Sequence, residues 1–194
     1  MISKKIHYIW LGNDRLSSFS KMCINSWRRN LPDYEIIEWN EKNLNLKKLI
    51  KDNLFLEKCY KYKLWAFMSD YLRLYILYNE GGIYFDTDVE VVRSLDPLLE
   101  NKCFFGFENG DKIANNLGDY ICTGIIGAEK YNFTIKKLLD FYDDGIWYTR
   151  EYVNTIVFKE LYLLDNNIFK DCTIYPVDYF SPYQPNNEYS TVVE

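Results

Sequence analysis

Paired cysteines are missing from this chain of 194 residues. Its five cysteines are an odd number, and no two of them form a CxxC motif, so a disulfide framework is not indicated. The chain also begins without the pattern of a secretory signal. We therefore expect reduced, mostly buried thiols in a cytoplasmic protein. The cysteines are Cys23, Cys59, Cys103, Cys122 and Cys172.

Long apolar runs and an excess of positive charge are also missing. No uninterrupted apolar stretch approaches the roughly 18 residues of a membrane-spanning helix. The net charge is -5, which argues against non-specific binding of nucleic acid. Repeats and an interdomain linker are absent as well, so we expect one domain, with at most a small appendage.

Histidine is scarce, since His7 is the only one in the chain. We expect it on a strand over residues 4–11, where it points with Ile9 and away from Tyr8 and Trp10. A lone histidine among apolar neighbours is more often a satisfied core residue than a ligand, so a supporting role is favoured. Trp10 stands at the end of that strand. Its indole either stacks on a planar base or fills the core, and the residues alone favour neither.

The abundant residue types indicate a globular protein. Hydrophobic residues make up 48% of the chain and charged residues 26%, which is typical of a folded domain with a single sizeable core. The 18 tyrosines fit a site for flat or polyhydroxylated ligands, because the ring stacks and the hydroxyl forms hydrogen bonds. General enrichment in Lys, Asn, Ile and Tyr is the alternative explanation, and composition alone favours it.

Strands and helices are expected to alternate over the first half of the chain. The expected strands are residues 4–11, 34–39, 83–86, 89–92, 103–107, 120–127 and 173–177. The expected helices are about 18–30, a short stretch from Asn40, 56–79, 132–143 and about 149–163. This alternation predicts an α/β fold with a mostly parallel central sheet flanked by helices. In such sheets, ligands bind beyond the carboxyl ends of the strands.

The segment from Gly81 to Val91 is the most informative part of the chain. Two glycines end the long helix, and an apolar strand then runs into Asp86-Thr87-Asp88. Side chains two apart on a strand point to the same face, so we expect the two carboxylates side by side at the strand end. Such a pair is unfavourable unless positive charge lies beside it. A divalent cation that bridges to a phosphate is the natural candidate.

Asp70 and Arg73 add opposite charges near the end of the helix that leads into this segment. They are three residues apart and share a helix face with Ala66, whose small side chain leaves room for a ligand or for close packing. A surface ion pair of little energetic value is the simpler interpretation. Their place before the glycine turn favours instead a position at the same cleft as Asp86 and Asp88.

Eight segments, taken in order, resemble glycosyltransferase family 32, the DXD-containing sugar transferases of capsular and lipopolysaccharide biosynthesis and their yeast Golgi mannosyltransferase relatives. They are Lys5–Gly12, Ser26–Trp27, Leu31–Tyr34, Trp39–Asn40, Ser69–Arg73, Gly81–Val89, Gly106–Asn109 and Thr123–Ala128. A lone DXD arises often by chance, whereas Ser-Asp-Tyr-x-Arg followed by Gly-Gly and a strand into Asp-Thr-Asp is specific. The match covers roughly residues 4–180, and the catalytic core of clostridial glucosylating toxins is similar as well.

The resemblance implies a GT-A-type nucleotide-sugar-binding fold over residues 1–180, followed by a polar tail at 181–194. It also implies a nucleotide-sugar donor and a divalent metal, with Mn2+ favoured over Mg2+. Family members often close the diphosphate with a His-Trp segment near the C-terminus, and no such pair follows Ser181. We expect a truncation, an absent closing segment or a substitute residue.

Site roles also follow from the resemblance. The implied catalytic residues are Asp70, Arg73, Asp86 and Asp88, and the implied donor-binding residues are Ile9, Trp10, Asp70, Arg73, Tyr84 and Asp86. Asp88 would be the direct metal ligand, with Asp86 beside it on the sugar nucleotide. Asp70 and Arg73 would contact the donor sugar and its phosphate, and Trp10 would stack near the nucleotide base.

The implied reaction is the retaining transfer of a hexose or N-acetylhexosamine to a saccharide or lipid-linked saccharide acceptor. The donor would carry UDP in preference to GDP, and both front-face and covalent routes stay open. Arginine and cation would stabilise the leaving diphosphate, and Asp70 an oxocarbenium-like sugar. The acceptor candidates are Glu108, Asn109, Thr123 and Gly124. Surface polysaccharide synthesis would place the enzyme in the cytoplasm, with peripheral contact at the inner membrane face.

Two rival functions remain on the sequence. A phosphohydrolase of the haloacid-dehalogenase type also has a strand that ends in Asp-x-Asp, with the first aspartate as nucleophile. Glu90 occupies the Thr/Val position of that motif, and the motif lies too late in the chain, so this class is disfavoured. A non-catalytic carbohydrate-binding or assembly protein with the same fold is the second rival, because the closing segment is missing.

Overall fold

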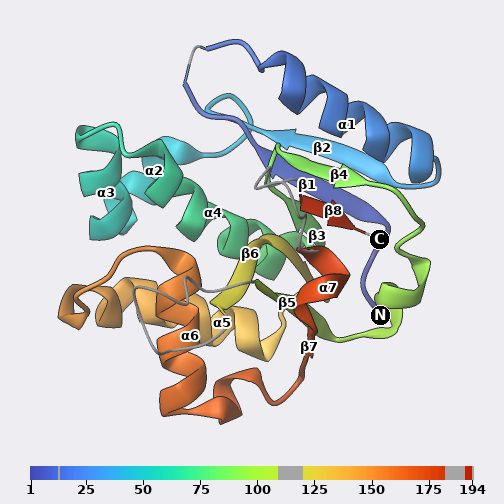
Figure 1. The fold of residues 1–194 in the computed structure, drawn as a ribbon. Helices are drawn as coiled ribbons and strands as arrows, with labels where there is room; N and C mark the ends of the chain where they lie inside the picture. The colour runs from blue at the N-terminus through green and yellow to red at the C-terminus, as the bar shows by residue number, and fades with distance from the viewer. Residues whose placement is uncertain (13, 109–119, 182–190, 194) are drawn as a thin grey trace, which may run out of the picture.

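The computed structural model describes residues 1–12, 14–108 and 120–181 and the backbone of residues 191–193. Within them, a six-stranded sheet has the order β2-β1-β3-β6-β5-β7 (Figure 1). Its strands are β1 Lys5–Ile9, β2 Glu35–Trp39, β3 Gly82–Phe85, β5 Cys103–Glu108, β6 Tyr120–Ala128 and β7 Cys172–Tyr175. β6 is antiparallel to both neighbours, whereas the other pairs are parallel. The expected α/β fold with a mostly parallel sheet is confirmed.

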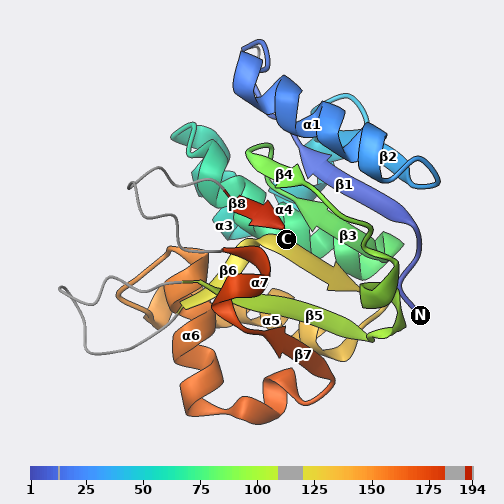
Figure 2. The ribbon, with the colours of Figure 1, turned by 45° about the vertical axis from the view of Figure 1, so that its right-hand side comes forward.

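Helices cover both faces of this sheet. The helices are α1 Ser18–Asn30, α2 Leu46–Asp52, α3 Leu54–Lys61, α4 Trp65–Glu80, α5 Phe133–Asp140, α6 Asn154–Leu164 and α7 Val177–Phe180. One hydrophobic cluster joins the sheet to α2 through α6, and a second joins its other face to α1 and α7 (Figures 1 and 2). A separate parallel pair, β4 Val89–Val91 and β8 Thr191–Val193, lies beside α1.

The first helix illustrates how the local sequence sets an element. Ser17 caps α1, because its side chain accepts the backbone N–H of Ser20. Cys23 and Trp27 lie on the buried face of α1, and the Trp27 indole donates to the carbonyl of Val89 at 2.6 Å. Burying such a large side chain contributes about 2–3 kcal/mol. The predicted helix over residues 18–30 is confirmed.

The predicted long helix over residues 56–79 is wrong in one respect, since it is broken into α3 and α4. Lys63 adopts the left-handed conformation, with φ of 56°. The N–H of Leu64 reaches back to the carbonyl of Cys59 at 2.8 Å, which closes the end of α3. The apolar periodicity continues through the break, so the pattern carried no sign of it. The later helix predicted over 149–163 begins only at Asn154.

Two glycines join α4 to β3 as the sequence predicts. Gly81 ends α4 with φ of 65°, and its N–H bonds to the carbonyl of Leu77. At Gly82, with φ of 111°, an added Cβ would lie 2.8 Å from the Lys5 carbonyl oxygen and 2.9 Å from His7. Both positions therefore require glycine, because L side chains are strained at such φ and no space is left.

The carboxyl ends of β1, β3 and β5 meet at one edge of the sheet, here called the carboxyl edge. Trp10, Asp86 and Glu108 lie there. The expected placement of Asp86 and Asp88 on one strand face is wrong: β3 ends at Phe85, and the N–H of Val89 bonds to the carbonyl of Asp86 in a turn. The turn lets the two carboxylates take different surroundings.

Two further points concern the chain as a whole. Among the described residues, no helix combines the length and the apolar character that a membrane crossing needs. The division into a domain at residues 1–180 and a tail at 181–194 stays a prediction.

Candidate active site

Arg73 forms the centre of the site, although it comes from the middle of a helix. Its side chain is only 6% exposed. One terminal nitrogen lies 2.9 Å from Asp70 Oδ1 and 3.3 Å from Asp86 Oδ1. The other lies 3.3 Å from Asp86 Oδ2 and donates to the Thr123 carbonyl at 2.6 Å. The surface ion pair considered for Asp70 and Arg73 is thereby excluded, since the two side chains are only 14% and 6% exposed.

Asp86 is held on both carboxylate oxygens. Arg73 grips it as a fork, and the Tyr84 hydroxyl donates to Oδ1 at 2.8 Å. The guanidinium also lies over the Tyr84 ring, 4.8 Å from its centroid, which adds a cation–π attraction. The Asp86 side chain is still 36% exposed. A carboxylate bound in this way is a poor phosphohydrolase nucleophile but is well placed to accept hydroxyls.

Asp70 is the most perturbed acid of this cluster. Burial raises its pKa to about 6, the Arg73 charge opposes this shift, and the Asp86 charge adds to it. The carboxylate is therefore ionised near neutral pH and takes up a proton in mildly acidic solution. Its position beside Arg73 gives the site a second fixed negative charge, suited to ring hydroxyls or to a developing positive charge.

Asp88 has different surroundings although it is only two residues from Asp86. It lies in the turn before β4 and is exposed. Burial of part of the carboxyl raises its pKa, and the charge of Asp86 adds to the rise. Within the described parts of the chain, Asp88 makes no ion pair. A cation beside it would remove the unfavourable proximity to Asp86.

These two aspartates fit a divalent cation of the expected kind. Mg2+ and similar ions are usually held by one or two carboxylates together with substrate phosphates and water. Asp88 and Asp86 supply two carboxylates at the carboxyl edge. No group of three His, Cys, Asp or Glu side chains converges anywhere in the described residues, the carboxyl edge included, so a complete protein cage is not indicated among them.

The other residues of the expected donor site flank this cluster. Trp10 is half-buried, and its indole N–H donates to the Asp14 carbonyl at 2.8 Å. The side chain packs against the core on the α1 side of the sheet and lies at the carboxyl edge. Ile9 is only 6% exposed and belongs to the core on the α4 side, so a contact with donor would involve its backbone. Both donor assignments stay predictions.

His7 is a structural residue, as the sequence favoured. It is fully buried, with Nε2 2.8 Å from the Gly81 carbonyl oxygen, and Nδ1 accepts the Trp39 indole N–H at 3.0 Å. These partners assign the neutral imidazole with its proton on Nε2. Burial lowers the His7 pKa, in keeping with this form. His7 thus ties β2 to the glycine turn that positions β3.

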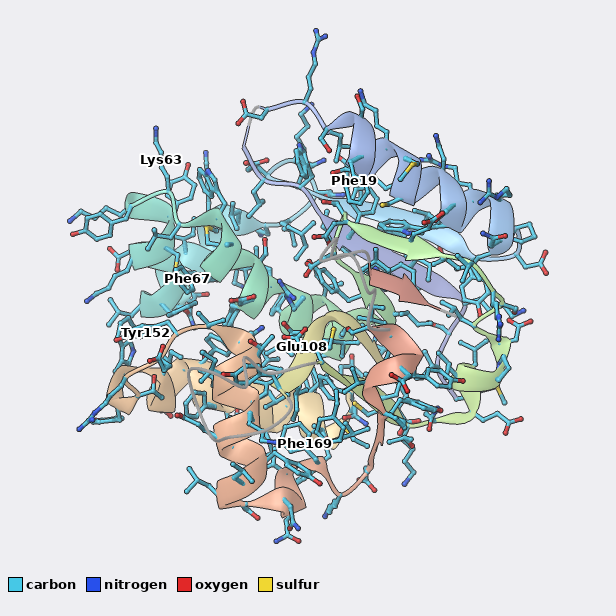
Figure 3. All side chains as sticks on the ribbon, in the orientation of Figure 1. Phe19, Lys63, Phe67, Glu108, Tyr152 and Phe169 are labelled. Atoms are coloured by element: carbon cyan, nitrogen blue, oxygen red, sulfur yellow. The ribbon has the colours of Figure 1, made fainter. Side chains whose placement is uncertain are left out.

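The acceptor candidates divide into two groups. Glu108, labelled in Figure 3, ends β5 at the carboxyl edge. Burial raises its pKa, a Cys122 hydrogen bond opposes the rise, and the Asp86 charge adds to it. The Thr123 carbonyl and Gly124 instead brace the Arg73–Asp86 pair, since a Cβ at Gly124 would lie 3.2 Å from Asp86 Oδ2. Asn109 lies outside the described residues. All four acceptor roles stay predictions.

Sequence reasoning missed two buried residues behind Asp70. The Tyr142 hydroxyl donates to Asn154 Oδ1, and Asn154 Nδ2 lies 3.5 Å from the Asp70 carbonyl oxygen. Tyr142 belongs to a π-helical turn, Phe141–Gly145, which follows α5. π-turns are frequent at functional sites. Neither residue stands in a recognisable motif, and one tyrosine among 18 carries no signal by itself.

Comparisons with known proteins indicate a resemblance to glycosyltransferases. A family model described as a glycosyltransferase sugar-binding region containing a DXD motif matches residues 18–105. "Subversion of eukaryotic traffic protein A" of Legionella pneumophila is 26% identical over 182 residues, 79% of this chain and 28% of that protein. "Inositol phosphoceramide mannosyltransferase 3" of Schizosaccharomyces pombe is 32% identical over 119 residues, 60% of this chain and 32% of that protein. The chain thus spans about a third or less of these two relatives.

A solved structure supports the fold. The PaToxG glycosyltransferase superposes with a TM-score of 0.64 at 23% identity, covering 87% of this chain and 73% of that one. This confirms the expected GT-A-type fold. The matched region contains Asp70, Arg73, Asp86 and Asp88, the residues that the structure gathers at the carboxyl edge. Over residues 18–105, the chain therefore resembles the glycosyltransferases whose sugar-binding region contains the DXD motif.

Proposed function

We propose that this chain is a metal-dependent retaining glycosyltransferase that moves a hexose or N-acetylhexosamine from a nucleotide sugar to a saccharide or lipid-linked saccharide. The match of residues 18–105 to the DXD family model supports glycosyl transfer as the reaction. The name of the fission yeast relative makes mannose one of the first sugars to test. UDP is the favoured nucleotide and GDP the second.

The buried cluster around Arg73 is the observation that carries this proposal. In it, the Arg73 guanidinium lies between two carboxylates, with one nitrogen 2.9 Å from Asp70 Oδ1 and 3.3 Å from Asp86 Oδ1. The cluster is fixed before any substrate arrives, so little reorganisation is needed during the reaction. Fixed charges at the edge of a parallel sheet suit a ligand with both hydroxyls and phosphates.

Each residue has a role that follows from its surroundings. Asp86, oriented by Arg73 and Tyr84, accepts hydroxyls of the ribose or the sugar. Asp70 holds the sugar ring and favours positive charge developing at the anomeric carbon. Trp10 offers an aromatic surface to the base.

Asp88, with Asp86 beside it, would hold the divalent cation, with Mn2+ favoured over Mg2+. When bound, the cation supplies positive charge that stabilises the leaving diphosphate. Arg73 reinforces this effect by keeping Asp86 in place and by adding its own charge close by.

A role in surface polysaccharide synthesis and a cytoplasmic location, with peripheral contact at the inner membrane face, belong to this proposal. They rest on the family resemblance and on the lipid acceptor in the name of the fission yeast relative. The chain spans about a third or less of these relatives, so acceptor choice is the part that needs direct measurement.

Donor hydrolysis tests the proposal without knowledge of the acceptor. The protein is incubated with a panel of UDP- and GDP-sugars, with Mn2+, with Mg2+ or with a chelator, and release of nucleoside diphosphate is measured. We expect one donor to be hydrolysed, only in the presence of a divalent cation. Asp88→Asn should abolish the release, whereas Glu100→Gln, an exposed acid on another turn, should leave it unchanged.

The rival functions give different results in the same experiment. A non-catalytic carbohydrate-binding protein would raise its melting temperature with a saccharide or nucleotide sugar yet release no nucleoside diphosphate from any donor. Metal-independent release that Asp88→Asn does not affect would contradict the proposed metal site. Thermal shift with each donor, with and without Mn2+, shows which donor is bound.

A further inference from the structure

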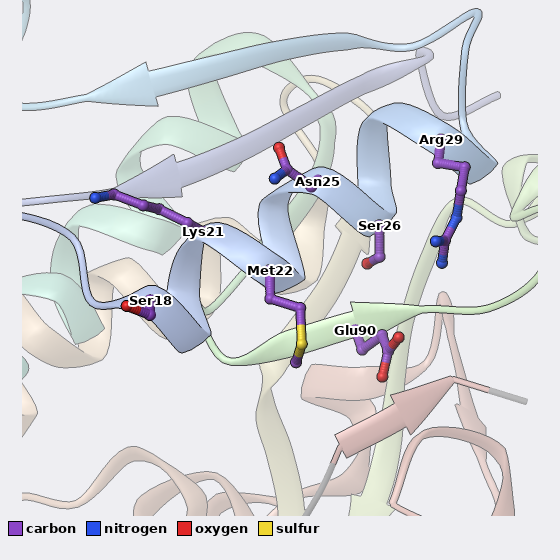
Figure 4. A pocket seen from close by; sticks show the side chains of 7 residues that line it. All are labelled: Ser18, Lys21, Met22, Asn25, Ser26, Arg29 and Glu90. Carbon is purple, nitrogen blue, oxygen red and sulfur yellow. The ribbon is translucent and has the colours of Figure 1, made fainter.

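A groove beside the carboxyl edge is not used by the proposed function. It lies between α1 and β4, has a volume of about 440 Å3 and is shown in Figure 4. Among the described residues that line it are Ser18, Lys21, Met22, Asn25, Arg29 and Glu90. Pockets of roughly 300–1,000 Å3 hold small molecules, so this groove has room for an organic molecule larger than a single inorganic ion.

One wall of the groove is a cationic stripe of α1. Lys21, Asn25 and Arg29 recur every four residues and therefore share a helix face. No acidic residue occurs in α1, although the whole chain has a net charge of -5. Within the described residues, neither Lys21 nor Arg29 forms an ion pair. This wall therefore presents positive charge and hydrogen-bond donors to the groove.

The floor of the groove is held in place by hydrogen bonds between α1 and β4. The Ser26 hydroxyl accepts the N–H of Val91 at 2.9 Å, and the Trp27 indole donates to the Val89 carbonyl at 2.6 Å. Glu90, between these two valines, also lines the groove. The floor of the groove is therefore fixed before a ligand arrives, which lowers the entropic cost of binding.

The groove lies near the expected metal site, because Glu90 and Asp88 both lie close to Cys23 of α1. Glu90 is two residues beyond Asp88, and both approach the same part of α1. Burial raises the pKa of the Cys23 thiol to about 11, and the negative charges of Glu90 and then Asp88 add to the rise. A ligand in the groove would therefore extend toward the edge where the donor sugar is expected.

We propose that the groove between α1 and β4 binds a phosphate-bearing polyol. Lys21 and Arg29 lie at opposite ends of the groove (Figure 4), so each offers a cation to phosphate oxygens at its own end, and Asn25 and Ser18 donate hydrogen bonds along the same wall. Glu90 accepts hydroxyl groups of the polyol. The inference rests on the proposed function in one respect: in a glycosyltransferase, the bound polyol would be part of the acceptor. The same chemistry occurs in a lipid head group and in a soluble polyol phosphate.

Titration of the full chain with matched probes tests this assignment. Calorimetry measures binding of myo-inositol 1-phosphate and of inorganic phosphate. Co-sedimentation measures binding to vesicles of phosphatidylcholine with or without phosphatidylinositol. The groove variant is Lys21→Gln with Arg29→Gln. The charge-matched control is Lys47→Gln with Lys48→Gln, two exposed lysines of α2 outside the groove lining.

We expect the groove variant to bind the organic phosphate at least about tenfold more weakly, and the control to stay within about twofold of wild type. Loss of binding to inositol phosphate assigns a soluble source, and loss confined to vesicles assigns a lipid source; either supports the proposal. The proposal would be overturned if wild type and the groove variant bound the organic phosphate equally well, or if the control variant lost as much affinity as the groove variant. It would also be overturned if wild type bound inorganic phosphate as tightly as the organic phosphate.

Donor hydrolysis on the same preparations separates the two hypotheses. Hydrolysis without any Lys21- and Arg29-dependent binding refutes the groove assignment and leaves the proposed function standing. Binding without hydrolysis of any donor supports the groove assignment and refutes the proposed transferase.

Discussion

The site has an inner half, formed by Arg73 and the oxygens around it, and an outer half, formed by Asp88. Among the described residues, charges in the inner half are paired within the protein, whereas the charge of Asp88 is not. In the inner half, every guanidinium nitrogen of Arg73 has an oxygen within 3.3 Å, supplied by Ser69, Asp70, Asp86 or Thr123. In the outer half, Asp88 is exposed and forms no ion pair with described residues.

This difference separates residues that hold the fold from residues that wait for a ligand. A buried charge must be paired in the folded protein, or its desolvation destabilises the structure. An exposed carboxylate at a turn carries no such constraint, so its identity is explained by what it binds. The inner half should therefore respond to mutation in stability and activity, and the outer half in activity alone.

The largest effect is expected for Arg73→Met. Asp70 and Asp86 would then lie close together without their cation, and breaking a buried pair of this kind costs about 3–5 kcal/mol. Urea denaturation followed by circular dichroism measures the loss. Arg28→Met, at an exposed arginine of α1, should change the free energy of unfolding by less than about 0.5 kcal/mol.

Arg73→Lys refines this comparison, because it keeps the charge and removes the fork. We expect an intermediate loss of stability and a marked loss of donor hydrolysis. Near-normal stability in both Arg73 variants would show that the inner cluster is not a structural element.

Asp88→Asn should show the opposite profile. Its free energy of unfolding should stay within about 0.5 kcal/mol of wild type, because an exposed side chain is changed. Donor hydrolysis should fall on the order of 100-fold or more, since a bound cation contributes several kcal/mol to the transition state. Steady-state kinetics across a Mn2+ series measures this.

Glu90→Gln is the matched control for that measurement, as the same chemical change two residues away. It should keep the Mn2+ dependence of donor hydrolysis. If both variants shift the Mn2+ dependence equally, the metal would not depend on Asp88 in particular.

Trp10→Ala should weaken donor binding without unfolding the protein. Stacking of a base on an aromatic ring contributes about 1–3 kcal/mol, so KM for the donor should rise roughly 5- to 150-fold. Trp10→Phe should retain most of the affinity, since a ring remains. A change in kcat alone, with KM unaltered, would argue that Trp10 supports the core of the site and does not contact the base.

The smallest effect concerns the titration of Asp70. Burial raises its pKa to about 6 from 3.8, so kcat/KM for donor hydrolysis should fall as the pH drops through 6. Below pH 6, kcat/KM should decrease about tenfold for each pH unit. In Asp70→Asn the residual activity should lack this acid limb, whereas Asp33→Asn should retain it.

Stability should change with the opposite sign over the same range. The folded protein binds the Asp70 proton more tightly than the unfolded chain does, so this group's contribution to the free energy of unfolding decreases as the pH rises from about 4 to 6. Asp70→Asn should lack that component. An identical pH dependence in wild type and Asp70→Asn would mean that Asp70 does not titrate in this range.

Local signals explain which features were predictable. The helix over residues 18–30, the glycine turn after α4 and the alternation of strands and helices each depend on neighbours in the chain, and each is confirmed. The break at Lys63 was missed because a left-handed lysine is rare and the apolar pattern continues across it. The turn at Asp86–Asp88 was missed because an i, i+2 spacing fits a strand and a turn equally.

The sequence by itself determined the resemblance to DXD-containing glycosyltransferases and the residues of the motif, because both depend on short segments in a fixed order. Only the tertiary structure decided that Asp86 is gripped by Arg73 while Asp88 stays exposed. It also brought Tyr142 and Asn154 behind Asp70 and opened a groove between α1 and β4. These arrangements depend on contacts between residues far apart in the chain, and no local pattern of residue types encodes such contacts.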